Sequence, residues 1–81
     1  MNLTEELERA ARELRLGHVA AGCDAFGRCA DELARLLALP ANADGAAQLL
    51  PYLQEALAAQ ERADWLALAD VLQYELAERL E

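Results

Sequence analysis

The stretch HVAAGCDAFGRCADELARLLALP, residues 18–40, has the residue pattern of a long α-helix. Its large apolar residues recur at intervals of four or seven, which places them on one side of an α-helix. The helix ends before Pro40, because proline cannot continue helical hydrogen bonding. Three sets of residues share the helix: a large apolar seam of Val19, Phe26, Leu33 and Leu37; a small-residue stripe of Ala20, Cys23, Gly27, Ala30 and Ala34; and a charged side of Asp24, Arg28, Asp31 and Arg35.

The small-residue stripe borders the large apolar seam, which favours a place for it in the core. A surface for self-association is the alternative. Gly22 and Gly27 lie inside the same helix, where glycine costs about 0.5–1 kcal/mol relative to alanine. We therefore expect another backbone to pass close to this helix at both glycines.

Composition supports an all-α fold for the rest of the chain. Of the 81 residues, 17 are Leu and 19 are Ala, whereas Ile, Ser and Lys are absent. Only Thr4, Val19 and Val71 are β-branched. Leu and Ala are among the best helix formers, whereas strands favour β-branched and aromatic residues.

The chain is short enough to form one domain, residues 1–81. We expect an up-and-down bundle of about four helices. The first two are either separated at Gly17 or merged into one kinked helix. Asp44 is the expected N-cap of the third helix, which either contains Pro51 or begins near it. The expected helices cover residues 3–16, 18–39, 44–60 and 63–80.

The formal charge of −8, from 15 acidic and 7 basic residues, excludes some classes of partner. An acidic surface repels phosphate backbones and anionic lipids, so we expect neither nucleic-acid nor membrane binding. The N-terminus carries acidic residues where a signal peptide carries basic ones, and no apolar run approaches the length of a membrane span. These features predict a cytoplasmic protein.

The sequence lacks the residues of common catalytic centres. Without Ser or Lys it can form neither a serine nucleophile nor a Schiff base. His18 is too far round or along a regular helix from Cys23 and Cys29 to form a catalytic pair with either. No Glu-x-x-His pair is present to bind metals in a bundle. We therefore predict a protein that is not an enzyme and that binds no cofactor or metal.

The fourth expected helix presents a candidate protein-binding surface. On a helical wheel its inward apolar face comprises Trp65, Leu68, Ala69, Leu72, Leu76 and Leu80. The opposite side carries an aromatic and an apolar residue among acidic ones, and an exposed tyrosine can anchor a protein contact. This surface comprises Ala67, Asp70, Val71, Tyr74 and Glu78.

The segment LPYL, residues 50–53, and the segment ADWLALADVLQYEL, residues 63–76, carry a resemblance. With its Asp-aromatic, Leu-Ala-Asp and Tyr-Glu-Leu elements, the region 50–76 resembles a segment of small uncharacterised bacterial helical proteins. The resemblance implies a helical hairpin. In general character the chain also resembles the small chaperones of flagellar and secretion systems.

We therefore predict a protein–protein interaction module that also self-associates, with a homodimer as the expected assembly. Within that class we expect an adaptor or chaperone-like role in a bacterial assembly or secretion pathway. Two alternatives are a helical bundle that binds a small molecule and an enzyme that uses Cys and His or carboxylates.

Overall fold

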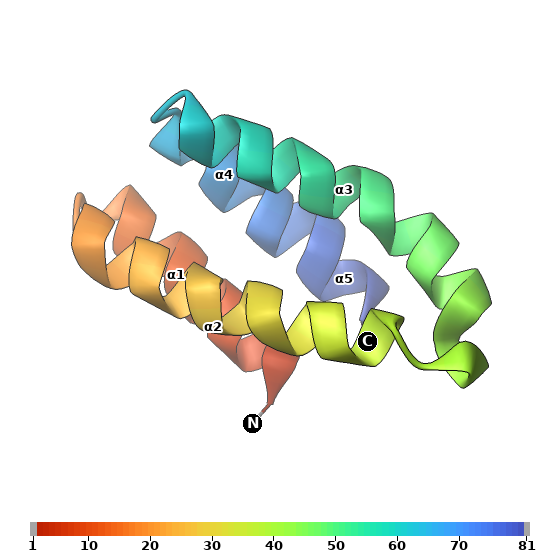
Figure 1. Cartoon of the computed structure of the whole chain (residues 1–81). Helices are drawn as coiled ribbons and strands as arrows, with labels where there is room; N and C mark the ends of the chain where they lie inside the picture. Colours follow the sequence, from red (N-terminus) through yellow and green to blue (C-terminus); the bar gives the residue numbers. More distant parts are fainter. Residues whose placement is uncertain (1, 81) are drawn as a thin grey trace.

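The computed structural model describes residues 2–80, apart from the side chain of Asn42, and confirms the all-α prediction (Figure 1). The described chain forms helices and no strand. Two elements depart from α-helical geometry: η1 is a short 3₁₀ turn and η2 is a π-helical segment. In chain order the elements are α1 (Leu3–Arg15), α2 (Val19–Leu37), η1 (Pro40–Asn42), α3 (Ala43–Glu61), α4 (Trp65–Asp70), η2 (Val71–Leu76) and α5 (Ala77–Arg79).

A turn at Gly17 separates α1 from α2, so the alternative of one long kinked helix is wrong. Gly17 has a φ of +85°, a left-handed conformation that glycine adopts at little cost. Before α1, the side chain of Asn2 accepts a hydrogen bond from the Glu5 backbone N–H at 3.1 Å. This bond satisfies one of the backbone donors left free at the helix start.

The start of α3 differs from the expected one. The segment η1 takes up most of the expected loop, and α3 begins at Ala43. Asp44 therefore lies in the first helical turn rather than at the cap, and its negative charge still suits the helix dipole there. Pro51 lies inside α3 with its ring exposed, so the alternative that the helix begins near Pro51 is wrong.

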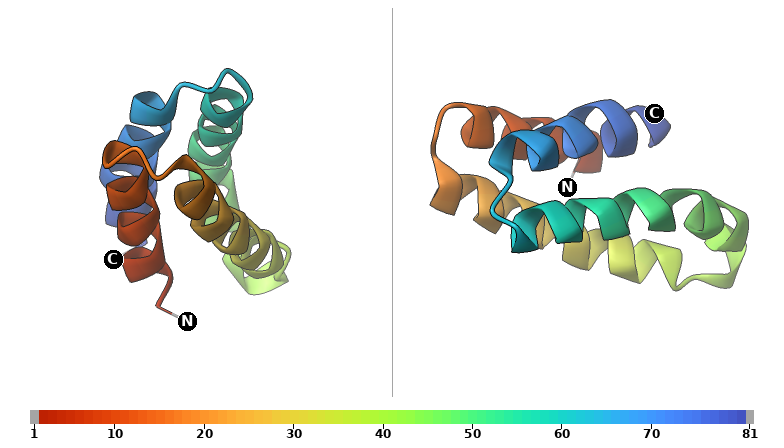
Figure 2. Two further views of the ribbon diagram at one scale, coloured as in Figure 1. Left: turned by 90° about the vertical axis from the view of Figure 1, so that its left-hand side faces the viewer. Right: turned by 90° about the horizontal axis from the view of Figure 1, so that it is seen from above.

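The helices form two layers, which Figure 2 shows from two directions. One layer holds α1 beside a continuous rod made of α4, η2 and α5. The other holds α2 beside α3, and these two helices contact each other little. Helix α1 packs extensively on both α2 and the rod, and α3 also packs on the rod. The core between the layers includes Leu7, Leu14, Phe26, Cys29, Leu68, Leu72 and Leu76.

The small-residue stripe of α2 lies at the edge of the core, and only Cys23 and Ala30 pack against it, so the preferred sequence interpretation holds for these two residues alone. Ala20, Gly27 and Ala34 are exposed, whereas Cys23 and Ala30 are half-buried. The physical reason is that α1 packs against the other flank of the helix, where Gly22, Ala25 and Cys29 are buried, and α3 leaves the stripe open.

The two glycines of α2 also differ from each other. A Cβ atom placed on Gly22 would lie 2.6 Å from Leu14 Cγ and 3.3 Å from the backbone oxygen of Ala10. The predicted close approach of a backbone is therefore confirmed at Gly22. A Cβ atom on Gly27 would meet nothing within 4 Å, so the same prediction is wrong there.

Candidate functional site

The rod of α4, η2 and α5 carries the candidate surface, and its middle turn is π-helical. A π segment changes which side chains share a face, and such segments occur frequently at functional sites. Asp64 caps the rod by accepting a hydrogen bond from the Ala67 backbone N–H at 3.2 Å. The rod packs on α1 and on α3 at once, so it buries a wider face than a helix with one neighbour.

The wide buried face changes one predicted site residue. Val71 is only 5% exposed, so its predicted place on the open surface is wrong: its side chain belongs to the core edge. Tyr74 is 53% exposed, as the sequence predicts. Asp70 and Glu78 are exposed and Ala67 is half-buried.

Four of the five predicted residues come together at one shallow groove of about 350 Å³ between α3 and the rod. Ala67, Asp70, Val71 and Tyr74 line it, whereas Glu78 does not. Two further carboxylates, Glu55 from α3 and Glu75 from the rod, complete the lining. Sequence reasoning missed Glu55 because nothing in its local pattern shows that α3 crosses the rod at this level.

Arg15 reaches this surface from α1 and binds three of its groups. Its guanidinium lies 2.7 Å from Asp70 Oδ1 and 5.5 Å from the centre of the Tyr74 ring, and it donates a hydrogen bond to Gln73 Oε1. An aromatic face and a carboxylate together form a favourable site for a guanidinium. On one side of the groove, Tyr74 and Asp70 therefore already bind an arginine of the same chain, Arg15.

The carboxylates of the groove differ in their partners. Arg79 Nη1 lies 2.8 Å from Glu75 Oε2, and Arg79 also stacks on the Tyr52 ring at 4.1 Å. Glu55 forms no ion pair with any residue in the range 2–80. The groove therefore has an acidic side on α3 that is open to a cation from outside.

The histidine and the two cysteines lie apart from this groove. His18 occupies the N-cap position of α2, and its Nδ1 is 2.7 Å from Glu13 Oε2. Cys29 is fully buried, and burial, aided by the Glu6 carboxylate and opposed by Arg28, raises the pKa of its thiol to about 11. A thiol with this pKa stays protonated at neutral pH and is a poor nucleophile. Within residues 2–80 no three His, Cys, Asp or Glu side chains converge as a metal site would require.

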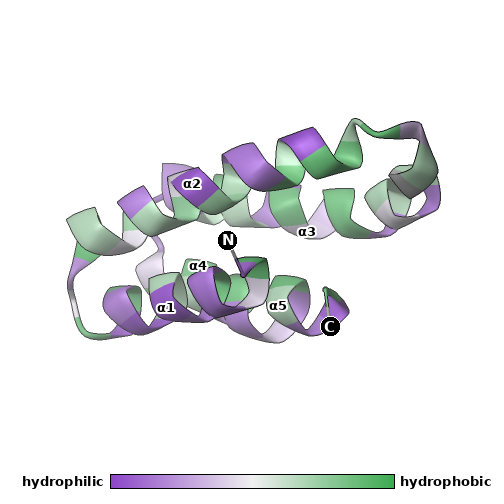
Figure 3. Cartoon of the chain, turned by 90° about the horizontal axis from the view of Figure 1, so that it is seen from below, coloured by the Kyte–Doolittle hydropathy of each residue, from purple (hydrophilic) through white to green (hydrophobic). Residues whose placement is uncertain are grey.

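A second depression lies between α2 and α3 and is almost entirely apolar. It has a volume of about 380 Å³. Figure 3 shows hydrophobic residues gathered where these two helices meet near η1. The lining consists of Ala34, Leu37 and Ala38 from α2 and Ala46, Ala47, Leu50 and Leu53 from α3.

No family model, curated protein or solved structure matches this chain. The resemblance of residues 50–76 to small bacterial helical proteins therefore stays a prediction. Among the described residues, no helix combines the length and the hydrophobicity needed to cross a bilayer.

Proposed function

We propose that this protein is a non-enzymatic helical interaction module, and that the groove around Tyr74 is its contact surface for a protein partner. The observation that carries the proposal is the concave surface that joins an exposed tyrosine to three carboxylates, Glu55, Asp70 and Glu75. Tyrosine is enriched among residues that dominate binding energy, because it offers a large rigid contact area with a polar end.

The chemistry of the groove favours a basic partner segment. Arg15 already occupies one side, where it contacts Tyr74 and Asp70. An arginine or lysine of the partner would approach from the α3 side, where Glu55 has no ion-pair partner among the described residues. Complementary charge speeds association and disfavours acidic partners, whereas the tyrosine contributes most of the contact.

The cellular role that we propose is an adaptor or chaperone-like one in a bacterial assembly or secretion pathway, exercised in the cytoplasm. Its support is the small acidic helical bundle with an open contact groove and two free cysteines. Free thiols are typical of a reducing compartment.

Affinity capture from the host lysate tests the contact surface. Tagged wild-type protein is compared with Tyr74→Ala and with Leu39→Ala. Leu39 is a matched control because it is 51% exposed, against 53% for Tyr74, and lies after α2, far along the chain from the rod. We expect a retained protein that Tyr74→Ala loses and Leu39→Ala keeps, with retention falling as the salt concentration rises. Equal retention by all three proteins would contradict the proposed surface.

A further inference from the structure

The outer face of the α2–α3 layer is a second apolar surface, separate from the Tyr74 groove. It contains the apolar depression near η1 and continues along α3 through Leu50 and Leu57, which are 47% and 46% exposed. On α2 it continues through the small-residue stripe, with Gly27 open to solvent. Helices rarely leave such a long apolar face without a partner.

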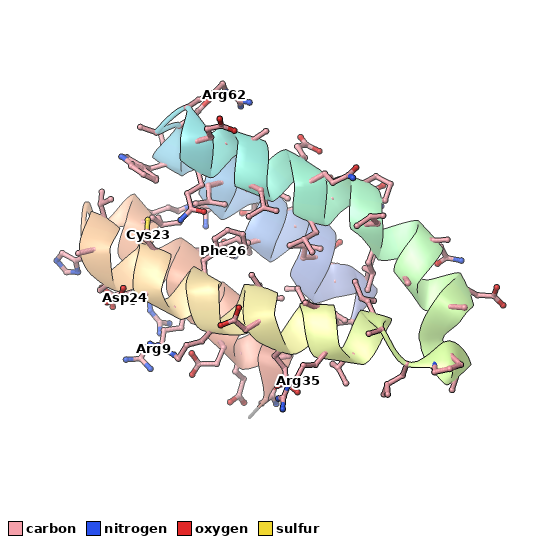
Figure 4. All side chains as sticks on the ribbon, in the orientation of Figure 1. Arg9, Cys23, Asp24, Phe26, Arg35 and Arg62 are labelled. Atoms are coloured by element: carbon pink, nitrogen blue, oxygen red, sulfur yellow. The ribbon has the colours of Figure 1, made fainter. Side chains whose placement is uncertain are left out.

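The charges beside this face have a pattern that is complementary to itself. Asp24, Arg28, Asp31 and Arg35 follow one another along a single flank of α2, with acid and base alternating. Asp24 and Asp31 form no ion pair with any residue that the structure describes. Figure 4 shows Asp24 and Arg35 towards opposite ends of α2, with Arg35 pointing away from α3.

The two arginines are held only loosely. Arg28 lies 3.8 Å from Glu6 Oε2, and its side chain is 53% exposed. Arg35 pairs with Glu32 one helical turn away, and its side chain is 76% exposed. Exposed pairs of this kind are worth about 0.2–1 kcal/mol, so either arginine can exchange its partner at little cost.

We propose that this face binds a second copy of the chain, with the two α2 helices antiparallel about a two-fold axis near residue 29. Antiparallel pairing brings the same flank of the two helices together. Asp24 then lies beside Arg35 of the second copy, and Arg28 beside Asp31 of the second copy. The symmetry repeats each contact, so four ion pairs join the two copies.

The apolar residues match about nearly the same axis: their pairs centre between residues 28 and 29, whereas the charge pairs centre between residues 29 and 30, an offset that long arginine side chains can span. The small-residue stripe, extended to Leu37, has spacings of 3, 4, 3, 4 and 3, which read the same in both directions. Gly27 therefore lies opposite Ala30 of the second copy, and Cys23 opposite Ala34. Small residues permit close approach of the two α2 helices. The exposed leucines of α3 then cover the two sides of the interface.

The size of the face sets the expected strength. Two 19-residue helices side by side offer roughly 28 Å by 20 Å, or about 1,100 Å² over both copies, near the lower limit of specific interfaces. With a charge of −8 on each copy, general repulsion also opposes association. We therefore expect a dimer with a micromolar dissociation constant.

Sedimentation equilibrium of four proteins tests the arrangement: wild type, Asp24→Arg, Arg35→Asp and the double exchange. Within one helix these two residues lie about 16 Å apart, too far to pair with each other. We expect Asp24→Arg and Arg35→Asp each to weaken the dimer by roughly tenfold, since each change turns two attractive pairs into repulsive ones. The double exchange restores the wild-type affinity, and a mixture of the two single variants forms a heterodimer.

Glu8→Arg is the matched control for Asp24→Arg, because it makes the same change in net charge at an exposed position of α1. It leaves association unchanged or tightens it slightly. Exchange of Arg28 and Asp31 repeats the test at the second pair. A wild-type protein that stays monomeric at every concentration would overturn the proposal, as would a double exchange that fails to restore a weakened dimer. An Asp24→Arg dimer as tight as that of Glu8→Arg would overturn it too.

Discussion

Substitution of alanine for each of the two glycines in α2 should change stability in opposite directions. At Gly27 the new methyl group meets nothing, so the change gives only the helix-propensity gain of about 0.5–1 kcal/mol. At Gly22 the same gain is outweighed, because the methyl group would lie 2.6 Å and 2.7 Å from two carbons of Leu14. Leu14 is itself 3% exposed and cannot move into solvent.

Overpacking of this kind costs typically 1–3 kcal/mol, so Gly22→Ala should lose about 1–2 kcal/mol net after the propensity gain. Urea unfolding followed by far-ultraviolet circular dichroism measures both changes at concentrations where the chain is monomeric. In a domain of this size 1 kcal/mol corresponds to about 4–8 °C in Tm. A Gly22→Ala protein as stable as the wild type, or a Gly27→Ala protein less stable than it, would refute the packing of α1 on α2 described above.

Two further predictions concern a thiol and a strained turn. The free energy of unfolding should fall between pH 9 and 11, because the unfolded thiol of Cys29 ionises from its ordinary pKa of 9.0 while the folded thiol, with a pKa of about 11, keeps its proton. Below pH 9 this contribution is present, and about 3 kcal/mol is lost once the pH rises above 11. In pH-dependent urea titrations Cys29→Ala should lack this part of the slope, and an unchanged slope would contradict the assignment. Ala63→Gly should raise stability by up to about 1 kcal/mol, because Ala63 has a φ of +58° and this left-handed conformation costs a non-glycine residue about 1–2 kcal/mol. The greater freedom of glycine in the unfolded chain offsets part of the gain. A lower Tm for this variant would argue against the turn geometry.

The helices can be predicted from the sequence because the signals that define them are local. Leucine spacing, Gly17 and Pro40 each act within a few residues, and the structure agrees with them. Which face of α2 is buried depends on α1, which packs against Gly22 rather than against the small-residue stripe. No local pattern contains that information.

The residues of the candidate groove also fall into those that the sequence predicts and those that it does not. Tyr74 and Asp70 follow from the wheel of a single helix, whereas Glu55 comes from α3 and Arg15 from α1. Val71 was misplaced because a helix with two neighbours buries a wider face than the wheel of one helix suggests. The π-helical geometry of Val71–Leu76 has no signal in the residue pattern.

Photo-crosslinking in the host cell tests the central claim, that the groove around Tyr74 binds a protein partner, most directly. A benzophenone amino acid replaces Tyr74 in one protein and Leu39, which is exposed to a similar extent, in another. We expect one dominant crosslinked protein from position 74, with a basic segment at the crosslinked site, and no such product from position 39. The same products from both positions, or none from position 74 in a folded protein, would contradict it.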